Sequence, residues 1–72
     1  MTRVQISNSS TIKSIGYSYE TQTLEIEFHR GGVYQYADVP QATYQEFISV
    51  DSVGSYFHAN IKTQFTATKM GS

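Results

Sequence analysis

The stretch GGVYQYADVP, residues 31–40, decides how the first half of the chain folds. Two glycines open it, a Tyr-Gln-Tyr alternation follows, and a Val-Pro pair closes it. Alternate residues of a strand point to opposite faces of a sheet, so Tyr34 and Tyr36 share one face and Gln35 lies on the other. The two phenol rings are therefore either an exposed platform on which bases stack or a part of the core.

The loop before this strand decides between the two interpretations. A two-residue Gly-Gly turn would set Gln35 opposite Phe28 on the apolar face, and burying that amide without partners costs roughly 1–3 kcal/mol. A three-residue RGG loop, with a glycine in the left-handed region, sets Tyr34 opposite Phe28 and Tyr36 opposite Ile26. Because a slip of one residue reverses every side chain, the sequence predicts the three-residue loop, with both tyrosines in the core and Gln35 outside.

The two segments before this strand alternate in the same way. In TIKSIGYSY (11–19) and TLEIEFH (23–29), apolar residues recur at every second position, which is typical of a sheet with one buried and one solvated face. With ETQT (20–23) as a four-residue loop, apolar residues face one another across the hairpin: Tyr19 with Leu24, Tyr17 with Ile26, and Ile15 with Phe28. The first half is therefore predicted to be an antiparallel meander.

From Pro40 onward the spacing of apolar residues becomes helical. Pro40 suits the first turn of a helix in which Tyr44, Phe47 and Ile48 share one face. After this helix the chain continues into a second helical segment, and the β-prone TQFTAT (63–68) is expected to form a short terminal strand.

The second helical segment has a clear apolar face but a weaker helical composition. Val53, Phe57 and Ile61 are four residues apart, and either residue of the Asp-Ser pair at 51–52 is placed to cap the start. Gly54 weakens the pattern of one regular helix. The predicted fold is α+β: an antiparallel meander of three strands, or four with the terminal one, with one or two helices packed on one face.

The length of 72 residues predicts one domain, residues 1–72. A core of this size usually supplies only roughly 3–5 kcal/mol. The chain has no cysteine, which excludes disulfides and thiolate zinc sites, and only two histidines, which makes a structural metal site a poor alternative. Self-association is the remaining means of stabilisation, so a homo-oligomer is expected.

The charge pattern restricts the kinds of partner that this protein is expected to bind. The net charge is −1, and the five basic residues are scattered along the chain. Proteins that follow a long phosphate backbone cluster their Lys and Arg, so this pattern disfavours tight binding to long nucleic acid but allows a ligand with one or two phosphates. No apolar run has the length of a membrane span or the form of a signal peptide, which predicts a soluble, cytoplasmic protein that does not contact membranes.

No stretch matches a nucleophile elbow, a phosphate-binding loop or a dinucleotide fingerprint. Glu25, Glu27 and His29 share one strand face and could in principle hold a metal or transfer protons, but the sequence favours a solvated outer face whose charges discourage edge pairing. The sequence therefore predicts a protein that is not an enzyme, with no catalytic residue, metal or cofactor.

The densest polar and aromatic segment is SYFHANIK (55–62). Its side chains outside the apolar face suit a nucleotide, since Tyr56 can stack, His58 and Asn60 can hydrogen-bond a base, and Lys62 can meet a phosphate. The hydroxyls of Ser9 and Ser10, within SNSS (7–10), and the guanidinium of Arg30 complete the predicted ligand contacts. The candidate ligand-binding residues are Ser9, Ser10, Arg30, Tyr56, His58, Asn60 and Lys62. The alternatives are an ordinary amphipathic helix and a polar lead-in to the first strand.

Short motifs follow one another over residues 9–65: Ser9-Ser10, Ile12, Gly16-Tyr17, LEIEF, GGVYQY, Val39-Pro40, Ser52, Gly54, YF and Ile61-Lys62. In this order and spacing they resemble the KTSC family, the small domain named for the C-terminus of certain lysyl-tRNA synthetases. The resemblance implies a domain that occurs appended to synthetases or free-standing, including in viruses of bacteria, and for which RNA binding has been suggested. Many relatives carry asparagine at the position of His58 and a basic, tyrosine-rich tail, which is absent here.

Three hypotheses follow. The first is a non-enzymatic module that binds or sequesters a nucleotide as a homo-oligomer, for example a virus-encoded sponge for a host nucleotide signal. The second is RNA binding, which fits the family context and predicts a steep salt dependence but conflicts with the charge. The third is a protein-interaction or inhibitor module that adds a strand to an exposed edge near Val33 and Gln35. The sequence favours the first.

Overall fold

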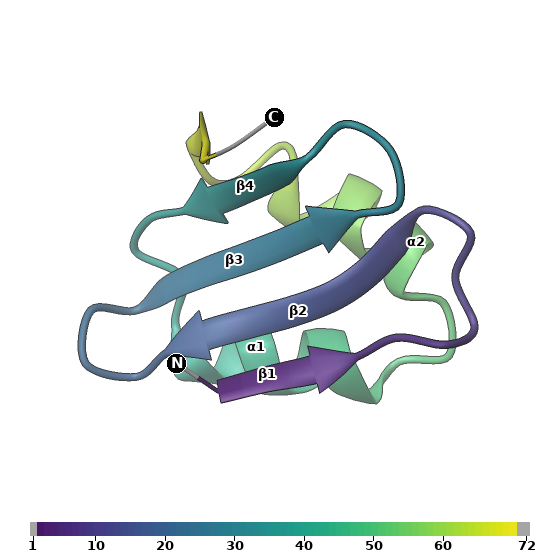
Figure 1. Cartoon of the computed structure of the whole chain (residues 1–72). Coiled ribbons are helices and arrows are strands. Elements are labelled where there is room, and N and C mark those ends of the chain that lie inside the picture. Colours follow the sequence, from purple (N-terminus) through teal and green to yellow (C-terminus); the bar gives the residue numbers. More distant parts are fainter. Residues whose placement is uncertain (1, 71–72) are drawn as a thin grey trace.

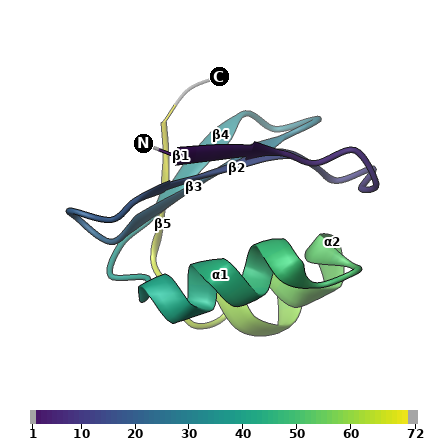
Figure 2. The same ribbon diagram turned by 90° about the horizontal axis from the view of Figure 1, so that it is seen from below.

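The computed structural model describes residues 2–70 and shows one antiparallel sheet with its helices on one face (Figures 1 and 2). The strands lie in chain order across the sheet: β1 (Thr2–Gln5), β2 (Ile12–Ser18), β3 (Thr23–Phe28), β4 (Val33–Tyr36) and β5 (Ala67–Lys69). The helices are α1 (Gln41–Ser49), α2 (Val53–Tyr56) and the π-helical η1 (Phe57–Ile61), which continues directly from α2. The α+β class is as predicted.

The sheet has five strands, so the prediction of three or four was wrong. The strand β1 was missed because its sequence, Thr-Arg-Val-Gln, carries almost no apolar signal, and only Val4 is even partly buried. The strand β5 begins at Ala67, inside the predicted segment 63–68, and ends at Lys69. Because β5 pairs with β4, the side chains Val33 and Gln35 do not lie at an edge of the sheet, in contrast to the edge considered for strand addition.

The β3–β4 hairpin has the predicted faces but different partners. Tyr36 is buried, Tyr34 packs against the core, and Gln35 lies on the open face. Tyr34 stands opposite Ile26 and Tyr36 opposite Leu24, a shift of two residues from the predicted pairs. The N–H of Phe28 donates to the carbonyl of Gly32 at 3.0 Å, so the three-residue loop is residues 29–31. A shift of two keeps every side chain on its face, so alternation alone does not reveal it.

The β2–β3 hairpin shows the same error of two residues. Tyr17 pairs with Leu24 and Ile15 with Ile26, and the connecting loop is residues 19–22 instead of 20–23. Tyr19 consequently leaves the strand and is 47% exposed, with its ring edge-on to the ring of Tyr17 at 5.1 Å. The predicted pairing of Tyr19 with Leu24 was therefore wrong, although the buried face of the hairpin was right.

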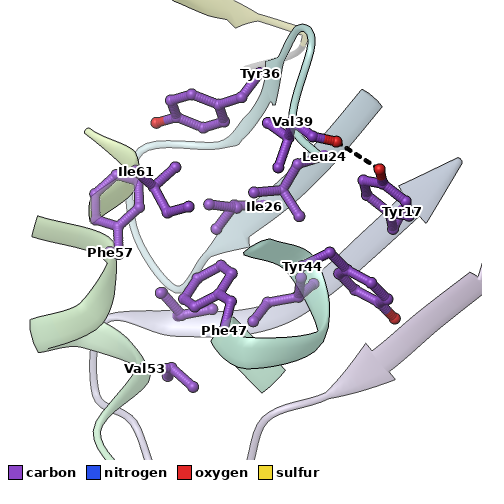
Figure 3. Close-up of a cluster of buried hydrophobic side chains, with 12 residues drawn as sticks. Tyr17, Leu24, Ile26, Tyr36, Val39, Tyr44, Phe47, Val53, Phe57 and Ile61 are labelled. Carbon is purple, nitrogen blue, oxygen red and sulfur yellow. Dashed lines mark hydrogen bonds between the residues drawn. The ribbon is translucent and has the colours of Figure 1, made fainter. Parts of the chain in front are cut away.

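The core lies between the sheet and the helices (Figure 3). Pro40 occupies the position just before α1, and Tyr44 and Phe47 of that helix are buried as predicted. The rings of Tyr17 and Tyr44 stack at 4.5 Å, and the hydroxyl of Tyr17 donates to the carbonyl of Val39. In the second helical segment the apolar face is confirmed, with buried Val53, Phe57 and Ile61.

One of the two residues predicted to cap the start of α2 does so. The hydroxyl of Ser52 accepts from the N–H of Ser55 at 3.4 Å, which makes Ser52, and not Asp51, the capping residue. None of the helices between residues 2 and 70 has the length and apolar character needed to cross a membrane.

Candidate functional site

A polar pocket lies at the end of the sheet where the connection from β1 to β2 meets the connection from α1 to α2. Its volume is about 430 Å³, and its lining consists of residues 8–11, residues 51–55 and His58. The two connections run side by side at the right of Figure 1. They are joined by the side-chain amide of Asn8, which donates to the carbonyl of Asp51 at 3.3 Å. Two segments 43 residues apart in the sequence thus form opposite walls of one site.

The wall formed by residues 8–11 is held in a turn by its own side chains. The hydroxyl of Ser9 accepts from the N–H groups of Thr11 and Ile12, at 3.2 and 3.1 Å. A serine hydroxyl that satisfies backbone donors in this way fixes a loop in one conformation. The neighbouring Ser10 is exposed, and within residues 2–70 its hydroxyl forms no hydrogen bond, which leaves it free to contact a ligand.

The opposite wall is formed by the capped start of α2. The hydroxyl of Ser52 accepts from the N–H of Ser55 and donates to the hydroxyl of Ser55 at 3.0 Å. Gly54 follows within the helix, and a Cβ placed on it would meet no heavy atom within 4 Å. Packing therefore does not require glycine here, although glycine lowers helix stability by about 1 kcal/mol relative to alanine. Gly54 is also one of the residues that line the pocket.

The β3–β4 loop closes the far end of the first wall. The backbone N–H of His29 donates to the carbonyl of Thr11 at 3.0 Å, and its Nε2 lies 3.1 Å from the carbonyl of Ser9. Since a carbonyl only accepts, that nitrogen carries the proton in this contact. Both bonds hold the loop, and hence the exposed Arg30, beside the wall formed by residues 8–11. Arg30 itself is not among the lining residues, of which Asp51 is the one acidic member.

The structure brings three of the predicted site residues into this pocket: Ser9, Ser10 and His58. Arg30 lies in the loop that is bonded to the pocket wall. Asn60 and Lys62 are exposed and lie outside the lining; the amide of Asn60 donates back to the carbonyl of Tyr56 at 3.4 Å.

Tyr56 also lies outside the lining. Its hydroxyl donates to Oε1 of Glu46 at 2.6 Å, and its ring stacks on Phe47 at 5.4 Å, so it joins α2 to α1. Burial, followed by the hydrogen bond and the negative charge of Glu46, raises the pKa of Tyr56 to about 12. This side chain positions α2, on which the pocket is built.

Most of the residues that line the pocket were not among the candidates predicted from the sequence, namely Asn8, Thr11, Asp51, Ser52, Gly54 and Ser55. The sequence did contain a signal for part of this lining. Ser9, Ser10, Ser52 and Gly54 belong to the motifs quoted above, yet none of them is an apolar core residue. Motif residues that do not fill a core are candidates for a site, and these four converge on one pocket.

The strand residues Glu25 and Glu27 lie on the open face of the sheet, where neighbouring side chains contact both carboxylates. Arg3 pairs with Glu25, and the hydroxyl of the buried Ser14 donates to Glu27 at 3.0 Å. His29 turns away to Ser9. Among residues 2–70, no three His, Asp or Glu side chains come together in a way that could hold a metal ion.

Comparisons with known proteins agree with this architecture. The sequence profile of the KTSC domain matches residues 8–65. An uncharacterized protein of Stutzerimonas stutzeri is 41% identical over 64 residues, which cover 89% of each chain. A lysine–tRNA ligase of Nostoc sp. is 45% identical over 56 residues, which cover 78% of this chain and 10% of the ligase. The crystal structure of a KTSC domain protein from Yersinia pestis superposes with a TM-score of 0.92, at 43% identity and 97% coverage of each chain.

Proposed function

The chain belongs to the KTSC family, and from this premise we propose that it binds a small polar ligand of nucleotide size without catalysing a reaction. The observation that carries the proposal is the convergence of Ser9, Ser10 and His58 on one pocket, from a loop and a helix near opposite ends of the family match. A volume of about 430 Å³ is within the range of small-molecule sites, which is roughly 300–1,000 Å³.

The lining suits a ligand with many hydrogen-bonding groups. Hydroxyls such as that of Ser10 both donate and accept, and the exposed imidazole of His58 can hydrogen-bond or stack on a base. The walls are fixed by the Asn8 and Ser9 hydrogen bonds before any ligand arrives, which reduces the ordering cost of binding. Arg30, held beside the wall, is the cation for a phosphate group.

Self-association is part of the proposal. The pocket opens to solvent, and Lys62 lies outside the lining of its own chain. A second copy that covers the opening would bring further cations to the ligand, including Lys62, and would bury more apolar surface than one small chain can. Sequestration of a nucleotide in such a closed site is one biological role that fits.

The proposal is tested by isothermal titration with the common nucleoside mono-, di- and cyclic phosphates, together with a measurement of solution mass. We expect at least one nucleotide to bind and to raise the unfolding temperature, because a ligand that binds only the folded state stabilises it by mass action. His58→Ala and Ser10→Ala should weaken this binding, whereas Gln45→Ala, on the exposed surface of α1, serves as the matched control. Equal affinity of the wild type and both pocket variants would refute the assignment of the site.

RNA binding is the second candidate, and it is favoured by the similarity to a segment of lysine–tRNA ligases. The distribution of charge weakens it, because Arg3 and Lys13 are paired with carboxylates on the open face, at Glu25 and Glu27. Titration of a single-stranded RNA over a salt series separates the two candidates. Contacts to many phosphates give a steep loss of affinity with salt, whereas one mononucleotide in the pocket gives a shallow one.

A further inference from the structure

The strands β1 and β5 form the two edges of the sheet in residues 2–70, and they differ in how well they are protected against pairing with another chain. We propose that the edge of β1 is an interface with a second copy of this chain, in which two β1 strands pair antiparallel around a two-fold axis. The inference goes beyond the proposed function, because no residue of β1 is among those that line the pocket. This contact is separate from a copy that covers the pocket opening, and it is tested without any ligand.

The strand β1 carries a single charge, and that charge is drawn away from the free edge. Arg3 is the one charged residue of Thr2–Gln5. Its guanidinium donates to the hydroxyl of Ser14 on β2 at 2.7 Å and pairs with Glu25 on β3, so it points across β2 into the sheet. Edge strands are normally protected by charges, prolines or bulges. The strand has no proline, and its register against β2 is unbroken, so its edge is open to a further strand.

The opposite edge, at β5, is protected. This strand has only three residues, all of them exposed, and it ends at Lys69. Short edge strands and lysines on the edge both discourage pairing with another chain. We therefore expect the second copy at β1.

The backbone of β1 determines which of its groups are free to bond. The N–H of Ile6 donates to the carbonyl of Lys13, at the start of β2, at 2.9 Å. The bonds of an antiparallel pair alternate along each strand, so the backbone groups of Val4 also point to β2, whereas those of Arg3 and Gln5 point to the free edge. Each of the latter two residues therefore offers one N–H and one C=O group to a second copy.

These free groups and the side chains select one register. A ladder forms only where free groups of one copy meet free groups of the other, so Arg3 and Gln5 must pair among themselves. Pairing Arg3 with Arg3 would set like charges opposite each other, which is destabilising. Pairing Gln5 with Gln5 would leave Arg3 without a partner in the second strand. Pairing Arg3 with Gln5 of the second copy uses the free groups of both residues and sets Val4 opposite Val4 at the centre.

The two-fold axis passes through this central valine pair, perpendicular to the sheet. Val4 points to the helical side of the sheet, because it stands opposite the buried Ile15, and it is only partly buried in a single copy. Pairing would therefore cover apolar surface that one chain leaves exposed. The axis keeps the helices of both copies on one face and brings α1, which lies beneath β1 in Figures 1 and 2, toward the interface.

Analytical ultracentrifugation over a concentration series tests the interface with two matched proline variants. Gln5→Pro removes an N–H that points to the free edge, so the bonds between β1 and β2 remain while each strand loses a bond to the second copy. Lys69→Pro is the control at the other edge: the N–H of Met70 donates to the carbonyl of Val33, so that of Lys69 points outward. We expect the wild type and Lys69→Pro to be dimers and Gln5→Pro to be a monomer.

Single cysteines test the register, because the chain has none of its own. Opposed residues in a pair without hydrogen bonds have Cα atoms about 4.5 Å apart, which a disulfide can bridge. Val4→Cys should therefore give a disulfide-linked dimer on mild oxidation. Gln5→Cys should not, because this residue is displaced by two positions from its counterpart in the second copy. Linkage of Gln5→Cys in place of Val4→Cys contradicts the inferred pairing.

A wild type that stays monomeric throughout the concentration series overturns the inference, and so does a dimer that persists in Gln5→Pro. Equal dissociation of Gln5→Pro and Lys69→Pro also overturns it, because the edge of β1 would then have no special part. Circular dichroism verifies that each variant is folded. If Gln5→Pro is not, Val4→Lys takes its place, since it sets two like charges at the axis and leaves the backbone groups intact; a dimer that survives this change contradicts the interface.

Discussion

Arg3 and Glu25 form an ion pair although their strands are not neighbours in the sheet. Arg3 stands opposite Gly16 on β2, and Gly16 stands opposite Glu25 on β3, so the three residues lie in one row across the open face. Gly16 has no side chain, which lets the guanidinium pass over it. The same guanidinium donates to the buried hydroxyl of Ser14 at 2.7 Å. These contacts hold β1, which has little apolar surface of its own.

Replacing Gly16 by valine should destabilise the protein by about 1 kcal/mol, although valine is the better strand former. The branched side chain would stand between Arg3 and Glu25 and separate the pair. Urea unfolding measures the effect, and Ser18→Val, on the same face of β2, is the matched control. A Gly16→Val protein as stable as the wild type would show that the bridge over this glycine contributes nothing.

Tyr56 should make stability depend on pH in the alkaline range. Its pKa is raised to about 12 in the folded protein, whereas an unfolded tyrosine ionises near pH 10. The stabilisation is therefore fully present below about pH 10 and is lost as the pH rises through 12. Burial also raises the pKa of Tyr17, Tyr36 and Tyr44, which adds to the same decline.

The variant Tyr56→Phe isolates this contribution. It removes the hydroxyl that donates to Glu46, so we expect a loss of about 1 kcal/mol at neutral pH and a smaller decline in the free energy of unfolding between pH 10 and 12. Urea titrations at a series of pH values measure both quantities. An unchanged slope would mean that the bond between α1 and α2 does not form in solution.

Replacing Gly54 by alanine should change stability and binding in opposite directions. The added Cβ meets no neighbouring atom, and alanine favours the helix, so the protein should gain about 0.5–1 kcal/mol. Because Gly54 lines the pocket, we expect the added methyl group to reduce the space for a ligand and nucleotide affinity to fall. Thermal unfolding and titration on the same sample test the pair of effects; greater stability with unchanged affinity would place the ligand elsewhere.

Arg30→Ala and Lys62→Ala each remove one positive charge. Together they distinguish a ligand held by one chain from a ligand that also contacts a second copy. Arg30→Ala should lower the affinity for a nucleotide about tenfold, because the loop carrying it is bonded to the pocket wall. Lys62→Ala should lower it only where solution mass shows more than one copy. Full affinity of Arg30→Ala would remove the phosphate assignment, and full affinity of an oligomeric Lys62→Ala would remove the contribution of a second copy.

The faces of the strands could be predicted from the sequence, because alternation has a period of two and Gln35 is costly to bury. The partners of Tyr17 and Tyr34 could not, because a shift of two residues leaves the same side chains buried. That choice is made by backbone conformations in the loops, such as the positive φ angles of Gln22, Gly31 and Gly32. The strand β1 was unpredictable for a different reason, since the ion pair that holds it joins residues 22 positions apart.

Only part of the candidate site could be predicted from the sequence, because a pocket depends on which distant segments meet in space. His58 and Ser10 have side chains that suit a ligand wherever they lie, so their types alone suggested them. Asp51 and Gly54 become informative only when the structure places them opposite residues 8–11. Tyr56 shows the opposite case: its residue type suggested a ligand contact, but in the structure its ring packs on Phe47.

The hydrogen bond from Asn8 to Asp51 has a consequence for folding. It joins the start of the sheet to the turn between the helices, so the pocket is complete only when the helical layer has docked on the sheet. A chain in which the strands have paired but the helices remain detached would have half of the lining and no site. Binding of a ligand in the pocket therefore requires the helices to be docked, and the rate at which binding competence returns during refolding would measure that docking directly.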